Sequence, residues 1–188
     1  IGVAGIALVA TTGGGWWPVA PFLLLYGIGV GLATAQLTGV IMVEVPMTKI
    51  GQASGSQSTV RQIGSALGIA VLGTILFTAT QAAADTRLNA TQALQAMPSD
   101  QRATFIEGLS TTVVDSSGGF LPMIKGTLLD AGAPESAAVE LQNAANDAFT
   151  DGVKATGWAA AGFLFLGLLS TFSMGARRQG KKESKAKA

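Results

Sequence analysis

The 188-residue sequence contains no cysteine and no histidine. Without cysteine, the chain can form neither a disulfide framework nor a thiolate metal site. The absence of histidine removes the usual metal ligand and the usual general base near neutral pH. A membrane enzyme built on this chain would have to pair Asp or Glu with Ser or Lys, and no nucleophile–base spacing supports such a pair. We therefore expect no catalytic residues, no metal ion and no cofactor.

Charged residues are also scarce. They make up 12% of the chain, whereas soluble globular domains contain about 25%. Hydrophobic residues make up 48% of the chain, and its mean hydropathy is +0.45. The 25 glycines fit the same picture, because glycine is commoner in membrane helices than in soluble ones. The composition predicts a membrane protein.

Three largely apolar runs are long enough to cross about 30 Å of hydrocarbon as helices, which takes roughly 20 residues. Residues 1–12 are apolar but too short, so we expect them to be the end of a helix that begins upstream. The predicted segments are the end of a truncated transmembrane helix at 1–12, transmembrane helices at 18–45, 53–80 and 155–175, a loop with short helices at 82–154 and a basic tail at 176–188. The predicted fold is an all-α membrane protein with three full transmembrane helices and the end of a fourth.

Pairs of glycines recur along two of these spans, four residues apart, so that each pair lies on one helix face. In lipid, such faces let two helix backbones approach closely, because the lipid tails give apolar side chains no reason to associate. We predict that these glycines serve helix packing and gating. The pairs are Gly27 and Gly31, Gly51 and Gly55, and Gly64 and Gly68.

Four polar side chains lie within or beside the spans and are candidates for a polar cavity or a helix interface. Gln36 lies near the middle of its span, where its amide either bonds to a neighbouring helix or faces a substrate. Arg61, followed by Gln62, either extends to the interface or pairs with Glu44 or another carboxylate. Glu44 is the one acid near a span, but its place at the interface disfavours it as a proton carrier.

Charged residues occur regularly along segment 82–154, and no apolar run in it is long enough to span a bilayer. We expect a solvated loop with short helices. Its nine acidic and four basic residues are Asp85, Asp100, Glu107, Asp115, Asp130, Glu135, Glu140, Asp147 and Asp151 against Arg87, Arg102, Lys125 and Lys154.

Local signals place the ends of the helices in this loop. Ser99 follows a proline and predicts an N-cap, and Ser117-Gly118-Gly119 predicts a break. Pro134 predicts the start of a helix over 135–149. An apolar stripe at helical spacing either packs on other helices, which we favour, or lies on the membrane surface. The stripe consists of Leu121, Ile124, Leu128 and Leu129.

The distribution of charge predicts the orientation in the membrane. The C-terminal tail carries six basic residues and one acid, and basic segments stay in the cytoplasm. Nucleic-acid binding explains this tail less well, because no aromatic or folded platform accompanies it. We therefore expect a multi-pass protein of the cell membrane with a cytoplasmic C-terminus and with loop 82–154 outside. Trp16 and Trp17 would then lie at the outer headgroup level rather than in a protein core.

Consecutive motifs then suggest a family. They read Gly51-Gln-Ala-Ser-Gly55 and Arg61-Gln62-Ile-Gly64-Ser-Ala-Leu-Gly68, and they follow Gly27-Ile-Gly29-Val-Gly31 and Val45-Pro46. This pattern resembles the penultimate helix of fourteen-helix drug:proton antiporters, the EmrB/QacA type of the major facilitator superfamily. The resemblance is good over residues 20–80. The long loop, the last helix and the basic tail agree with it in topology.

The resemblance implies that the chain is the C-terminal portion, about helices eleven to fourteen, of a proton-coupled multidrug exporter. Such a transporter moves small amphipathic compounds by alternating access and confers antibiotic resistance. The implied partners are the lipid bilayer, the small-molecule substrate, protons and the missing N-terminal half of the same transporter. The coupling carboxylates of the family lie largely in that half. The implied role of the matching residues is therefore packing and gating, for Gly55, Arg61, Gln62, Gly64 and Gly68.

A second function class stays open on the sequence alone. The chain would then be a small membrane subunit that binds a partner protein through its acidic outer loop, residues 82–154. Many further spans upstream of Ile1 would exclude this class. Neither class involves nucleic acid.

Overall fold

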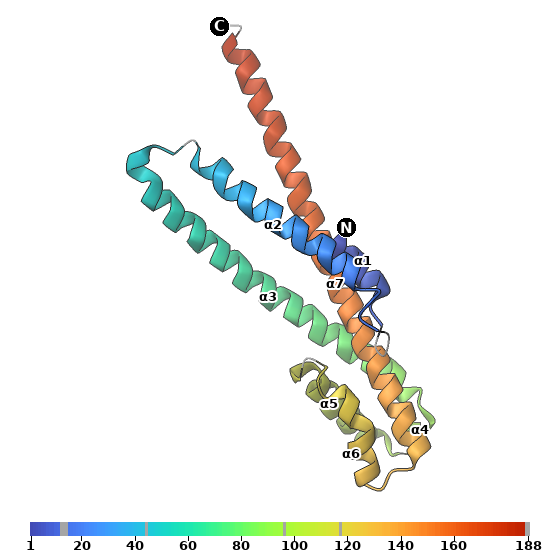
Figure 1. Ribbon diagram of the computed structural model, residues 1–188. Coiled ribbons are helices and arrows are strands. Elements are labelled where there is room, and N and C mark those ends of the chain that lie inside the picture. The colour runs from blue at the N-terminus through green and yellow to red at the C-terminus, as the bar shows by residue number, and fades with distance from the viewer. Residues whose placement is uncertain (12–14, 44, 96, 117, 187–188) are drawn as a thin grey trace.

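The computed structural model describes residues 1–11, 15–43, 45–95, 97–116 and 118–186. Every regular element among these residues is a helix (Figure 1), which confirms the predicted all-α class. The helices are α1 (Gly2–Val9), α2 (Ala20–Met42), α3 (Ile50–Asn89), α4 (Gln92–Gln95), α5 (Ser99–Asp115), α6 (Ile124–Asp130) and α7 (Glu135–Ala186), with 3₁₀ turns η1 (Met47–Lys49) and η2 (Leu121–Met123).

Three stretches are long and apolar enough to cross a membrane. They cover Ala20–Ile41, Met47–Asn89 and Glu135–Thr171, with 22, 43 and 37 residues. A crossing takes roughly 20 residues, so the first stretch matches one bilayer and the other two are about twice as long as needed. The chain is therefore a multi-pass membrane protein, as the uncharged runs predict.

Helices α3 and α7 continue well beyond the spans predicted at 53–80 and 155–175. Helix α3 runs on to Asn89 because the residues after Thr80 include neither proline nor glycine and are rich in alanine, the best helix former. Helix α7 begins at Glu135, as Pro134 predicts, but it does not end at Phe149. The helix continues because no proline follows Phe149 within it, and it passes through both Gly152 and Gly157. Where the bilayer begins and ends along these two helices stays a prediction.

The ends of the helices lie at two opposite ends of the molecule (Figure 1). The α2–α3 turn, which contains η1, and the C-terminal end of α7 lie at one end, and α4, α5 and α6 lie at the other. The described residues of the α1–α2 loop lie beside α7, between the two ends (Figure 1), where Trp16 and Val19 line a hollow together with Phe149. Helices α2, α3 and α7 thus run alternately toward and away from the end that holds the α2–α3 turn (Figure 1), as successive spans require.

The two tryptophans of the α1–α2 loop lie on the surface. Their ring centroids are 4.1 Å apart and their planes are nearly parallel. Trp16 is 65% exposed and Trp17 is 71% exposed, so neither belongs to a core formed by the described residues. Their predicted place at the headgroup level stays a prediction.

The described residues between Thr80 and Gly152 form a separate packed unit, which we call the distal module. It consists of the end of α3, the helices α4, α5 and α6, and the start of α7. One cluster of buried side chains consists of Ala84, Leu88, Leu94, Ile106, Leu141 and Ala148. A second cluster consists of Val113, Leu121, Ile124 and Ala145. These are the main buried clusters of the described chain.

The apolar stripe of the loop faces this core, as expected. Leu121 and Ile124 are buried, Leu128 packs against both clusters, and Leu129 is 39% exposed. The favoured prediction of packing is therefore confirmed for the first three residues, whereas Leu129 lies on the outer side of α6.

Two local predictions have different outcomes. Gly118 has φ +80°, a conformation that favours glycine, and ends the α5 region as predicted. Ser117 lies outside the described residues. The N-cap prediction for Ser99 is wrong, because Pro98 holds that position and Ser99 is the first helical residue. The fixed φ of Pro98 turns the chain into α5 without a side-chain hydrogen bond.

Candidate functional site

The predicted small-residue faces are open within this chain. If a Cβ were added to any of these glycines, no described residue beyond the glycine's own helix turn would place an atom within 4 Å of it. Gly68 is half-buried and the other five are exposed. The packing and gating role stays a prediction, and any partner lies outside the described chain. The six residues are Gly27, Gly31, Gly51, Gly55, Gly64 and Gly68.

Other glycines make the close helix contacts that the structure contains. Gly2 and Gly5 of α1 lie against Phe22 of α2, so that an added Cβ would overlap its side chain or backbone. Gly157 of α7 lies against Ala7 of α1, whose Cβ would be 2.8 Å from an added Cβ. Helix α1 is therefore held between α2 and α7 by small residues. The spacing of three between Gly2 and Gly5 places both on one helix face, and this spacing is the signal in the sequence that indicates the contact.

An apolar groove lies between α1, α2, α3 and α7, with a volume of about 400 Å³. That size suits a small-molecule site, for which about 300–1,000 Å³ is typical. A second hollow of about 360 Å³ shares Val3, Tyr26 and Leu164 with it. Tyr26 supplies the one polar side chain of the groove. The groove is lined by Val3, Tyr26, Leu67, Gly68, Val71, Leu72, Ala160, Phe163 and Leu164.

The predicted polar candidates do not line this groove. Gln36, Arg61 and Gln62 are all exposed. Arg61 lies about 16 Å along α3 from its first residue, at about 1.5 Å per residue, and among the described residues it has no ion pair. Glu44 lies outside the described residues, so its pairing with Arg61 is not tested. The structure therefore brings only Gly68, of the predicted residues, to the groove.

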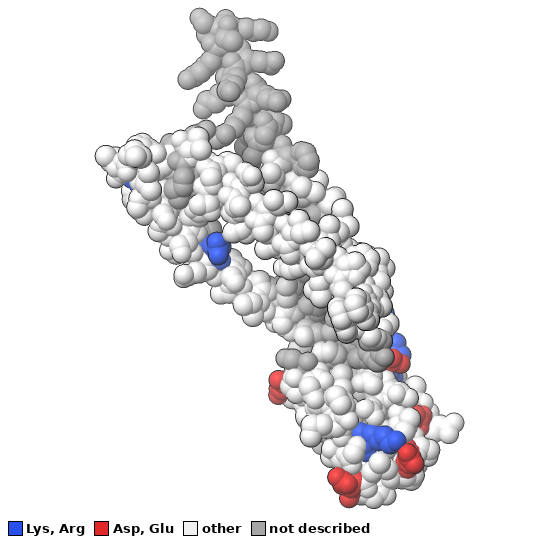
Figure 2. All heavy atoms as spheres, in the orientation of Figure 1, with Lys and Arg blue, Asp and Glu red and all other residues white. Residues whose placement is uncertain are grey.

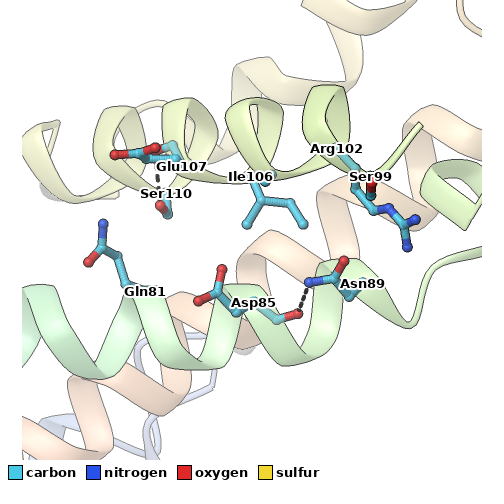
Figure 3. A pocket seen from close by; sticks show the side chains of 9 residues that line it. Gln81, Asp85, Asn89, Ser99, Arg102, Ile106, Glu107 and Ser110 are labelled. Atoms are coloured by element: carbon cyan, nitrogen blue, oxygen red, sulfur yellow. Dashed lines mark hydrogen bonds between the residues drawn. The ribbon is translucent and has the colours of Figure 1, made fainter. Parts of the chain in front are cut away.

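A polar groove of about 500 Å³ separates α3 from α5 in the distal module (Figure 3). Asp85 and Asn89 of α3 face Arg102 and Glu107 of α5 across it, and Ile106 lies between them. Asn89 Nδ2 donates to the Asp85 carbonyl oxygen at 2.6 Å. Among the described residues, the carboxylates and the guanidinium in this groove have no ion pair. Such a groove can bind charged groups, and the Ser110 hydroxyl in it donates to the backbone carbonyl of Glu107 rather than to a carboxylate.

Ion pairs tie the two long helices together in the distal module, where Lys and Arg side chains lie among Asp and Glu (Figure 2). Arg87 Nε donates to Asp151 Oδ2 at 2.8 Å, and Arg87 Nη1 donates to Asp147 Oδ2 at 3.3 Å. The hydrogen bond to Asp151 and the two nearby negative charges raise the pKa of Arg87. Lys125 Nζ donates to Glu135 Oε1 at 2.8 Å and lowers the pKa of Glu135.

Three curated relatives are similar to parts of the chain. A probable actinorhodin transporter of Streptomyces coelicolor is 34% identical over 61 residues, or 32% of this chain and 11% of the relative. A tetracycline resistance determinant of Streptomyces rimosus is 35% identical over 71 residues, or 37% of this chain and 20% of the relative. The multidrug resistance protein Stp of Mycobacterium tuberculosis is 48% identical over 52 residues, or 28% of this chain and 10% of the relative.

The matched segments span a fifth or less of each relative's own length. No family model and no solved structure matches the chain. Two of the relatives are named for drug resistance and one for transport. The matches do not single out the fourteen-helix branch. The chain is thus a multi-pass membrane protein that is similar, over part of its length, to proteins named for drug resistance and transport.

Proposed function

We propose that this chain is the C-terminal part of a proton-coupled exporter of small amphipathic compounds, which works by alternating access. The observation that carries the proposal is the similarity to proteins named for drug resistance and transport, at 34–48% identity. The motifs from Gly51 to Gly68 favour the fourteen-helix branch.

The open helix faces support a larger assembly around this chain. Side chains along α2 and α3 are largely exposed, for example Leu24 at 69% and Ile69 at 73%. Lipid can cover such side chains, but glycine faces gain little from lipid and much from a second helix. The glycine pairs would therefore pack against the remaining helices of the transporter, and the exposed apolar side chains would meet the bilayer.

The apolar groove supports amphipathic substrates. Aliphatic and aromatic side chains line it, and Tyr26 is its one hydroxyl-bearing residue. An amphipathic compound could bury its apolar ring system in this groove, and its charged group would then point toward the centre of the complete transporter. No acidic residue lies between 20 and 43 or between 50 and 84. The proton-carrying carboxylates would therefore come from other helices.

Dye efflux from proteoliposomes tests the proposal. The complete transporter that contains these residues should move ethidium against its gradient when a proton gradient is imposed, and a protonophore should stop the movement. The 188-residue chain alone should move no dye. Its segments 20–43 and 50–84 contain no acidic residue to carry protons, and the other helical bundle of the transporter is not part of it. Folded complete protein that moves no dye under any gradient would overturn the proposal.

A further inference from the structure

Helices α3 and α7 each pass without a break from the spanning region into the distal module. Helix α3 has 40 residues, which at about 1.5 Å per residue makes it about 60 Å long, or twice the thickness of the hydrocarbon. Neither helix contains a proline, and proline is the commonest cause of a sharp kink. Contacts that fix the two helices in the distal module therefore also fix how they leave the membrane.

The two helices meet at Thr80 and Gly152, where the module begins. Both residues are buried, and a Cβ added to Gly152 would overlap Thr80 Oγ1 and lie 3.1 Å from Thr80 Cβ. Other threonines of α3, such as Thr74 and Thr78, donate their hydroxyls to the carbonyl four residues earlier. Among the described residues, the Thr80 hydroxyl has no hydrogen-bond partner, and it lies against Gly152 instead. Opposite the threonine side chain, position 152 therefore favours glycine.

Beyond this contact, a cluster of buried apolar side chains joins α3 and α7. Ala84 and Leu88 of α3 belong to the same buried cluster as Leu141 and Ala148 of α7. Ile106 of α5 completes it and is 2% exposed. Helix α3 therefore cannot leave α7 without exposing this cluster to water.

Arg87 fixes the register of the pair. It reaches from α3 to Asp147 and Asp151, which are four residues apart on one face of α7. Sliding one helix along the other by a turn would move Arg87 away from at least one of these carboxylates. Exposed ion pairs add little stability, so their contribution here is alignment.

We propose that the distal module is a clamp that keeps α3 and α7 in one fixed pairing throughout the transport cycle. The two helices then move as a single body, and access to the substrate changes between this body and the rest of the transporter. The clamp rests on the proposed function for its role in transport, whereas the fixed pairing itself can be measured without transport.

A disulfide across the contact tests the clamp directly. The chain contains no cysteine, so Thr80→Cys with Gly152→Cys introduces the only thiols into these 188 residues. The 3.1 Å between the two Cβ positions is a few tenths of an ångström below the usual disulfide range of about 3.5–4.5 Å. Copper phenanthroline should oxidise the pair in membranes, and the single variants Thr80→Cys and Gly152→Cys should show no intramolecular link.

The oxidised double variant should export dye at a rate within about twofold of the reduced form, since a link between parts that never separate costs little. Full loss of export on oxidation, with recovery on reduction, would overturn the clamp. If the cysteine-free complete protein exports no dye, the proposed function is wrong. The clamp is then tested by the spin-label distance between α3 and α7, which does not depend on transport.

Spin labels at exposed positions avoid any disturbance of the contact. Thr86→Cys on α3 and Asn143→Cys on α7 are exposed sites in the distal module. Electron–electron distance measurements on the complete protein should give one narrow distance, unchanged by a proton gradient or by ethidium. A second distance population under either condition would contradict a fixed pairing.

Discussion

Gly64 and Gly68 lie on one face of α3, and Ala66 lies between them on the opposite face, because each residue advances a helix by about 100°. Gly68 also borders the apolar groove. No described residue packs on either glycine. A larger side chain at Gly64 therefore harms the protein only if a helix from elsewhere approaches that face, whereas one at Gly68 would also narrow the groove.

We therefore predict that Gly64→Leu or Gly68→Leu lowers dye export by the complete transporter at least tenfold, by pushing two packed helices apart. Ala66→Leu adds a similar volume to the opposite face and should keep most of the activity. Expression and export would be measured for all three variants. Unchanged export in both glycine variants would contradict a packed face.

The Lys125–Glu135 pair is a second residue-scale test. The hydrogen bond and the charge of Lys125 lower the pKa of Glu135 from its ordinary value of 4.5. A carboxylate whose pKa is lower in the folded state stabilises the fold at neutral pH, and that stabilisation is lost as the pH falls through the folded-state pKa. The Glu135 side chain is 73% exposed and that of Lys125 is 36% exposed, so solvent screens the pair and the effect is small.

Lys125→Met should accordingly lower the melting temperature slightly near pH 7, and the difference from the parent chain should vanish once the pH has fallen well below the ordinary carboxylate value of 4.5. Circular dichroism of both chains in detergent, followed over this pH range, measures it. A difference that grows as the pH falls would show that the pair does not act in this way.

The sequence marks candidate residues for helix packing, but it does not indicate contacts between distant segments. Glycine spacing marks Gly64 and Gly68 because the pattern is local. Thr80 and Gly152 are 72 positions apart, and nothing near either residue indicates the other. Pairing between distant positions depends on how the whole chain folds, so it emerges only with the structure.

At the scale of elements, the three spans follow from the sequence because lipid requires long runs without charge. The lengths of α3 and α7 do not follow. Charged residues appear after Thr80, so high hydropathy no longer indicates that α3 continues. The helix nevertheless extends to Asn89, because the sequence after Thr80 is rich in alanine. The local break at Gly118 was predictable, since its φ of +80° suits glycine.

Helix α5 should be essential to the distal module, because Ile106 fills the cluster between α3 and α7. Replacing a buried isoleucine by alanine typically costs about 2–5 kcal/mol. We expect Ile106→Ala to lower the free energy of unfolding of the module by that amount, and Leu129→Ala, at a 39% exposed site, to have a much smaller effect. Urea unfolding in detergent would compare them, and equal losses would argue against this core.

At the scale of the whole molecule, the order of the helices places the distal module and the α2–α3 turn at opposite ends (Figure 1). The basic tail predicts which end is cytoplasmic. Gln101 on α5 and Lys49 in η1 are both exposed and therefore report on the two sides of the membrane.

A membrane-impermeant maleimide should label Gln101→Cys in intact cells, and it should label Lys49→Cys only after lysis. The absence of cysteine from the chain keeps the background low. The reverse pattern of labelling would invert the predicted orientation.

The central claim is that these residues form part of a proton-driven drug exporter. The most direct measurement follows ethidium and internal pH together in proteoliposomes that contain the complete transporter. We predict that dye moves one way while protons move the other, and that both fluxes stop with Gly68→Leu. Dye movement that is indifferent to the proton gradient, or no movement by folded protein, would contradict the account.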